Sequence, residues 1–241
     1  MEPALLRHLC AYFTDPPGSK ASVATGVGVG GTMLAASHST HRHRREGMSL
    51  LNAWVSKERA LVAVDTQGLD QTGLRYPFSK LIPLAHATTV FASRGDRMYL
   101  AQLFRYYYLA RDPATASDYD GIVASAPSAL ASVNQDCRDN AGPDTFFHVV
   151  IVGWSPTRGR VAGMQYTGTT FSDEIESRPL ERVISPADCI SEPQTPADHG
   201  SMLRLARLQA PWLNAQGHPG GGDLVIAEIR KQRIEITSRP I

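Results

Sequence analysis

The order of apolar and polar residues from position 48 onward predicts strands near both ends of this part of the chain, with helices between them. Short apolar and β-branched runs bounded by turn residues are typical of strands, whereas apolar residues three or four positions apart are typical of helices. Lys57 and Glu58 separate the first two runs as a hairpin turn. The predicted strands are 49–56, 59–65, 80–84, 87–93, 146–153, 160–166, 182–185, 223–229 and 233–237, and the predicted helices are 97–110, 118–133 and 197–216.

This order of elements predicts an α+β fold, because strands are grouped before and after the helices instead of alternating with them. The run 146–153 is strongly apolar, which indicates a strand covered on both faces, and His148 within it is predicted to be a strand histidine rather than a catalytic base. We therefore predict a four-layer αββα sandwich of two antiparallel sheets whose outer faces are covered by helices. Segment 66–77 is polar, holds two glycines and is predicted to be a loop.

Residues 1–47 differ in composition from the rest of the chain. They show no sustained strand or helix period, which predicts a disordered extension, a pro-segment that is removed, or a start assigned upstream of the true one at Met48. His38, His41 and His43 have no carboxylate or cysteine beside them, which favours a solvated basic segment over a metal site. The predicted division of the chain is therefore 1–47 and 48–241.

Composition and charge argue against several classes of function. A hydrophobic content of 42% suits a globular domain, and a net charge of +1 without a basic stripe argues against a nucleic-acid partner. No apolar run in the sequence approaches the roughly 18 residues of a membrane-spanning helix. The three widely spaced cysteines indicate free thiols in a reducing, cytoplasmic setting. No cofactor or metal site is predicted.

Three polar residues stand at the ends of predicted strands near the start of the domain. Ser49 opens the first strand, Asp65 closes the second sixteen residues later, and Lys80 opens the third. A segment with small residues, 92–96, then leads into a helix, and a glycine-led strand, 221–229, begins the closing hairpin. In this order, and over about 190 residues, the sequence resembles the proteasome β-subunit family of N-terminal nucleophile (Ntn) hydrolases and its bacterial relatives.

The resemblance implies a hydrolase of peptide or other amide bonds in which Ser49 is the nucleophile once its α-amine is free. A hydroxyl needs a base at neutral pH, and the amine of the nucleophile itself can serve as that base. The resemblance further implies that Lys80, paired with Asp65, favours deprotonation of the amine and hydroxyl. Backbone N–H groups of Ala92 and Ser93, at a strand-to-helix turn, would hold the oxyanion.

Two departures from the family pattern keep a second interpretation open. The family usually has Thr where this chain has Ser49, and Gly217 and Gly220 stand where it has a supporting Asp and Ser. Taken one at a time, Asp65 is also typical of the start of a turn and Lys80 of a guarded strand edge. In the second interpretation the two residues form a structural ion pair. The chain would then be a catalytically silent proteasome-like subunit with a role in assembly or binding.

The sequence also predicts self-association. The helices 97–110 and 118–133, with the tyrosines 106–108, carry more apolar surface than one face of a sandwich needs. Members of the family that the sequence resembles associate through such helices, so we expect a homo-oligomer, with a ring as one form. The ring size and the need for an ATPase partner stay open at this point.

Overall fold

The computed structural model of the chain describes residues 49–69, 73–95, 97–108, 117–139, 144–191 and 194–241, and the statements below concern these residues. All of them belong to one compact unit, His43–Ile241. The predictions for residues 1–47, including the three histidines, lie outside the described residues.

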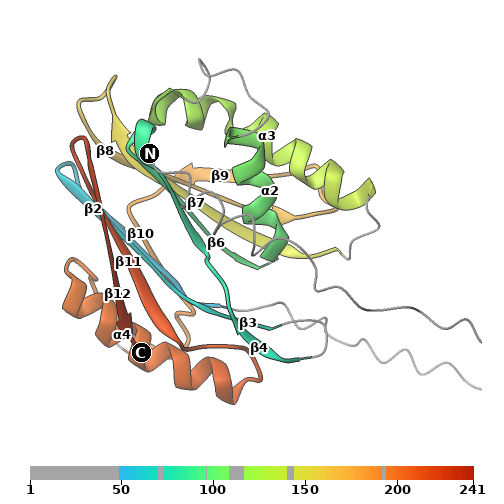
Figure 1. Cartoon of the computed structure of the whole chain (residues 1–241), viewed down its shortest axis with the longest axis vertical. Helices are drawn as coiled ribbons and strands as arrows, with labels where there is room; N and C mark the ends of the chain where they lie inside the picture. The colour runs from blue at the N-terminus through green and yellow to red at the C-terminus, as the bar shows by residue number, and fades with distance from the viewer. Residues whose placement is uncertain (1–48, 70–72, 96, 109–116, 140–143, 192–193) are drawn as a thin grey trace, which may run out of the picture. The chain divides into compact units, whose positions relative to one another are not determined.

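Two five-stranded antiparallel sheets form the centre of this unit (Figure 1). The first sheet has the strand order β10-β1-β2-β11-β12, the second has the order β5-β6-β7-β8-β9, and β3 and β4 form a separate pair. The strands of the first sheet are β1 Leu51–Val55, β2 Arg59–Asp65, β10 Arg182–Ser185, β11 Asp223–Arg230 and β12 Arg233–Pro240. Those of the second are β5 Leu81–Leu84, β6 Thr89–Gly95, β7 Phe146–Ser155, β8 Arg160–Thr169 and β9 Glu176–Pro179, and the separate pair is β3 Gln67–Leu69 and β4 Arg75–Pro77.

Three α-helices and one 3-10 helix complete the described part of the chain. They are α2 (Arg97–Tyr108), α3 (Tyr119–Asp139), α4 (His199–Ala215) and the 3-10 helix η1 (Ala85–Ala87). Of the helices within these described ranges, none combines the length and the apolar character that crossing a membrane requires.

Three apolar clusters separate the layers of the unit. Between the two sheets lie mostly valine, alanine and leucine side chains, such as Val62 of the first sheet and Val150 of the second. A cluster with several aromatic residues joins the second sheet to α2 and α3, and a third cluster joins the first sheet to α4. The order of layers is therefore a helix pair, a sheet, a sheet and a single helix, as Figure 1 shows.

The predicted α+β class and antiparallel sheets are confirmed, but three segments differ clearly from the prediction. The first is β9, which lies where no strand was predicted. Within the predicted loop 66–77, β3 and β4 pair, because the Phe78 N–H donates to the Thr66 carbonyl (2.7 Å) and the Tyr76 ring packs against that of Phe78. The helix predicted to end at residue 133 continues to Asp139. Its last turns are held by tertiary contacts of Asn134, whose side-chain oxygen accepts a 2.7 Å hydrogen bond from the Tyr99 hydroxyl.

Tyr106 and Tyr107 of α2 lie closer to the core than the prediction of self-association assumed. Tyr107 is buried, stacks on Phe91 and donates its hydroxyl proton to the Ile122 carbonyl, and Tyr106 packs edge-on against Tyr107. Among the residues whose side chains the structure describes, the large exposed hydrophobic ones are Leu74, Phe171, Leu208 and Ile236, and none of these belongs to α2 or α3. The homo-oligomer therefore stays a prediction, without an apolar helix surface among these residues to support it.

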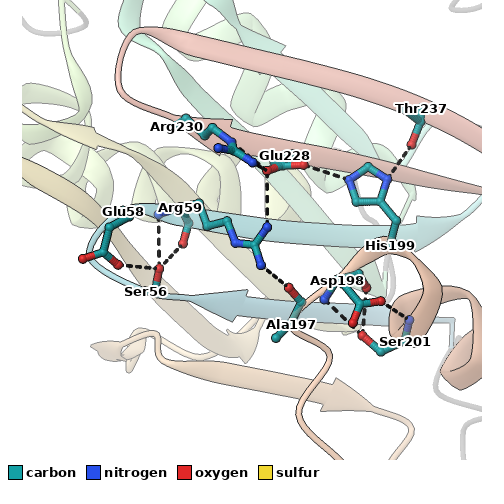
Figure 2. A network of polar contacts seen from close by, with 10 residues as sticks. All are labelled: Ser56, Glu58, Arg59, Ala197, Asp198, His199, Ser201, Glu228, Arg230 and Thr237. Carbon is teal, nitrogen blue, oxygen red and sulfur yellow. Dashed lines mark hydrogen bonds and ion pairs between the residues drawn. The ribbon is translucent and has the colours of Figure 1, made fainter.

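The start of α4 is fixed to the first sheet by a polar network (Figure 2). Asp198 caps the helix: its carboxylate accepts the Ser201 N–H (2.8 Å), and the Ser201 hydroxyl accepts the Asp198 N–H (3.1 Å). The next residue, His199, contacts the Glu228 carboxylate of β11 at 3.0 Å. Arg59 of β2 donates to the Ala197 carbonyl just before the cap. The network thus fixes the position at which the helix begins.

Replacing the capping carboxylate should weaken this attachment. We expect Asp198→Ala to lower the free energy of unfolding by about 1 kcal/mol, because the Ser201 N–H loses its acceptor, whereas Asp198→Asn should lose much less because asparagine is also a good cap. Urea denaturation of both variants measures the difference. Equal stability of the alanine and asparagine variants would contradict this role of the side chain.

His148 of β7 is buried in the second sheet, and its side chain lies on the strand face that Val150 and Val152 turn toward the first sheet. Burial and the positive charges of Arg94 and Arg178 together lower the pKa of His148 to about 4, while a hydrogen bond with Gln165 partly opposes this shift. The imidazole is therefore neutral at pH 7, in keeping with a strand histidine.

The lowered pKa of His148 predicts a specific pH dependence of stability. The folded pKa of about 4 lies below the ordinary value of 6.5, so the contribution of His148 is full above pH 6.5 and is lost as the pH falls toward 4. His148→Gln should remove up to about 3 kcal/mol of this acid-induced loss. Unfolding free energies between pH 7.5 and 4 measure it, with the exposed His86 changed to Gln as the control. Parallel curves for wild type and His148→Gln would refute the prediction.

Candidate functional site

Ser49, Asp65 and Lys80 lie together at one end of the sandwich. The Leu50 N–H donates to Asp65 Oδ1 (3.1 Å), and Lys80 Nζ donates to the same oxygen (2.7 Å) and to the Gln67 carbonyl (2.6 Å). The exposed fractions of Ser49, Asp65 and Lys80 are 5%, 0% and 6%. The Ser49 hydroxyl makes no hydrogen bond within the described residues. Ser49 is connected to Asp65 only through the backbone N–H of the next residue, Leu50.

The strand pairings explain why these residues meet. In the β1–β2 hairpin Leu51 is opposite Val64, so the preceding Leu50 is level with Asp65 at the end of β2. Lys80 directly precedes β5 and therefore belongs to the second sheet. The Lys80–Asp65 contact thus joins the two sheets at the end of the apolar cluster between them.

Burial shifts the pKa values of the ion pair toward each other. Loss of water raises the pKa of Asp65 and lowers that of Lys80, and the attraction between the two groups opposes both shifts. The N–H groups of Leu50 and Gly221 also favour the ionised carboxylate, although Asp65 Oδ2 makes no hydrogen bond within the described residues. A lysine whose pKa is lowered gives up its proton more readily than an exposed lysine.

The structure contradicts the prediction that Ala92 and Ser93 hold an oxyanion. Both residues lie inside β6, which continues to Gly95, so they are not at the strand-to-helix turn. The Ser93 N–H donates to the Lys80 carbonyl at 3.0 Å and is engaged. Because successive N–H groups of an antiparallel strand point to opposite neighbours, the Ala92 N–H points toward β7 instead. The direction of each N–H group depends on strand pairing, which the local sequence does not reveal.

Gly95 is the residue at this edge that the sequence analysis missed. By the same alternation its N–H points to the side of β5, two residues beyond Ser93, the last residue with a hydrogen bond to that side. Its φ of +107° is open to glycine, and a Cβ at this place would lie 2.1 Å from the Phe146 carbonyl oxygen. The requirement for glycine just before a helix was the signal that could have identified it.

Gly217 and Gly220, which follow α4, make hydrogen bonds and close contacts with the end of that helix. Gly220 exchanges hydrogen bonds with the Asn214 side chain, and a Cβ on it would meet the Ala210 carbonyl oxygen at 2.9 Å. Gly217 donates to the Asn214 carbonyl. Neither Gly217 nor Gly220 therefore brings a side chain to the group around Asp65, and Gly221 supplies an N–H that faces Asp65.

Comparison with known proteins adds no relative to this picture. No model of a protein family matches the sequence, and no characterised protein matches it at a significant level. The interpretation of the site therefore depends on the spacing of its residues and on the geometry given above.

The buried ion pair should be important for stability. Lys80→Ala leaves the Asp65 carboxylate buried without its cation, and we expect a loss of about 3–5 kcal/mol in the free energy of unfolding. Adding Asp65→Asn should recover part of the loss, because the neutral amide still accepts the Leu50 N–H. Urea denaturation measures both, with the exposed Lys57 changed to Ala as the control. A Lys80→Ala variant as stable as the control would show that Lys80 is merely a strand-edge residue.

Proposed function

We propose that residues 48–241 form an Ntn hydrolase domain of the proteasome β-subunit type, which hydrolyses peptide or other amide bonds with Ser49 as nucleophile. The observation that carries the proposal is the double contact on Asp65 Oδ1. This one oxygen accepts the N–H of the residue after Ser49 and the ammonium group of Lys80. The four layers of sheets and helices are compatible with the predicted αββα sandwich and support the same proposal.

The chemistry follows from the position of these groups. The Ser49 hydroxyl attacks the amide carbonyl carbon, and its proton passes to the free α-amine of Ser49, whose basicity is tuned by the neighbouring Lys80. The negative charge that develops on the carbonyl oxygen is stabilised by a backbone N–H, for which Gly95 is the candidate. The proton then goes to the leaving amine, and an ester on Ser49 is left for water to hydrolyse.

The mechanism requires Ser49 to be the first residue of the active chain, because an acylated nitrogen does not accept a proton. Two routes lead to this state. Translation from Met48 followed by removal of the initiator exposes Ser49, and so does cleavage of residues 1–48 from the full chain. In both cases the mature protein starts at the same residue.

One observation favours the alternative, a catalytically silent subunit with an assembly or binding role. Gly220 is held against α4 through Asn214 and leaves no room for the serine that the resemblance predicts nearby. In this alternative Asp65 and Lys80 form a purely structural ion pair.

The state of Ser49 distinguishes the two. We expect the protein isolated from its native source to have the mass of a chain that begins with Ser49, and to be acylated there by a β-lactone. Ser49→Ala should lose the labelling, and Ser49→Thr should keep it because threonine retains the hydroxyl. Ser132→Ala, a change of an exposed serine on α3, is the matched control.

Two results would refute the proposal that the protein is a hydrolase with Ser49 as nucleophile. One is a native chain that keeps Met48 or residues before it. The other is a chain that begins with Ser49 but is labelled equally in the wild type and in Ser49→Ala.

A further inference from the structure

A groove at the hairpin turns of both sheets has a strongly positive lining. It has a volume of about 780 Å³ and is lined by Trp154 and by the charged residues Lys57, Glu58, Arg158, Arg160 and Lys231. These residues come from the β1–β2, β7–β8 and β11–β12 turns or lie next to them. The groove therefore combines three segments that are far apart in the sequence.

The groove is separate from the candidate nucleophile site. Ser49 lies before β1 and Lys57 lies after it, so the length of a strand divides them. At about 3.3 Å per residue this distance is roughly 20 Å or more. A ligand in the groove thus does not contact Ser49.

The positive charges in the groove are largely unneutralised. Among the described residues, Lys57, Arg160 and Lys231 form no ion pair, and Lys231 lies over the Trp154 ring at 5.5 Å. Arg158 acts at a distance on Asp120, whose pKa it helps to lower. Four cations and the single carboxylate of Glu58 give the lining a net charge of +3. Such like charges repel each other, and a bound anion relieves the repulsion.

Hydrogen bonds to neighbouring elements fix the backbone of the turns that carry these cations. The Val161 N–H donates to the Lys57 carbonyl (2.9 Å) and so joins the turn ends of the two sheets. The Asp120 carboxylate of α3 accepts the Ser155 hydroxyl (2.7 Å) and the Thr157 N–H (3.0 Å). The backbone of the residues that carry the cations is therefore already ordered, so less conformational entropy is lost when a ligand binds.

The surroundings of the groove define the kind of anion that fits. Beside the groove, Arg59 and Arg230 share the single carboxylate of Glu228, and Arg233 contacts Glu235. These acidic partners interrupt the positive charge next to the groove, which argues against the extended basic track that a nucleic-acid backbone needs. A short segment with a few carboxylates matches a local charge of +3.

We propose that this groove binds an acidic segment of a partner protein, with successive Asp or Glu side chains paired to Arg158, Arg160 and the two lysines. Guanidinium groups suit carboxylates because they can donate two parallel hydrogen bonds. The proposal concerns binding and is independent of hydrolysis at Ser49.

Fluorescence anisotropy of a fluorescein-labelled hexaglutamate peptide, titrated with the full chain at low salt, tests the proposal. We expect saturable binding that Arg158→Glu/Arg160→Glu weakens by about tenfold or more. Arg207→Glu/Arg239→Glu makes the same change of charge on α4 and at the far end of β12, and should leave the affinity within about twofold. Ser49→Ala should bind like the wild type, so a failure of the proposed hydrolase leaves this test intact.

Three outcomes would overturn the proposal. The first is no saturable binding of the peptide. The second is an equal loss of affinity in the groove variant and in its control, which would indicate attraction by net charge alone. The third is tighter binding of a single-stranded oligonucleotide than of hexaglutamate with the same dependence on Arg158 and Arg160, which would assign the groove to nucleic acid.

Discussion

A buried charge must have a partner, and this constraint organises one end of the molecule. Asp65 ends β2 of the first sheet and Lys80 precedes β5 of the second, so their 2.7 Å contact joins the sheets where the apolar cluster between them ends. Two charges in an apolar setting are costly unless they are paired and hydrogen-bonded. Asp65 therefore also takes up the Leu50 N–H, which fixes the start of β1 and with it Ser49.

The packing between the sheets explains why the polar residues gather at the ends. The interior contains small and β-branched side chains, such as Ala53, Val64 and Ala92, which leave no space for charged groups along the strands. One end then carries the Asp65–Lys80 pair. At the other end the Val161–Lys57 hydrogen bond joins the sheets, and the basic groove lies beside it. Two separate groups of charged residues thus lie at opposite ends of the same pair of sheets.

The two helical layers are attached by different means. On the second sheet, aromatic rings provide much of the contact, as in the stack of Tyr99 on Phe147 at 4.1 Å between ring centroids. On the first sheet, α4 adds polar anchors: Asn52 and Gln209 are both fully buried and exchange amide hydrogen bonds of 2.7 and 3.0 Å. Such a reciprocal pair fits one register only, because a shift of the helix would leave both amides buried without partners.

The sequence by itself determined the elements whose signal is local. Alternating and continuous apolar runs predicted the β1–β2 and β11–β12 hairpins and the buried strand β7, because side-chain period depends only on neighbouring residues. Strand ends also marked Asp65 and Lys80 as candidates before any contact was known. The grouping of these elements was enough for the α+β class.

Only the tertiary structure decided which polar groups lie close together and which N–H groups are already engaged in hydrogen bonds between strands. The pairing of β5 with β6 engages the Ser93 N–H and leaves that of Gly95 at the edge. The basic groove unites Lys57 with Lys231, residues that no local pattern connects. The physical reason is the same in each case: hydrogen bonding and charge depend on strand register and on the packing of distant segments, and the period of a single segment carries no information about either.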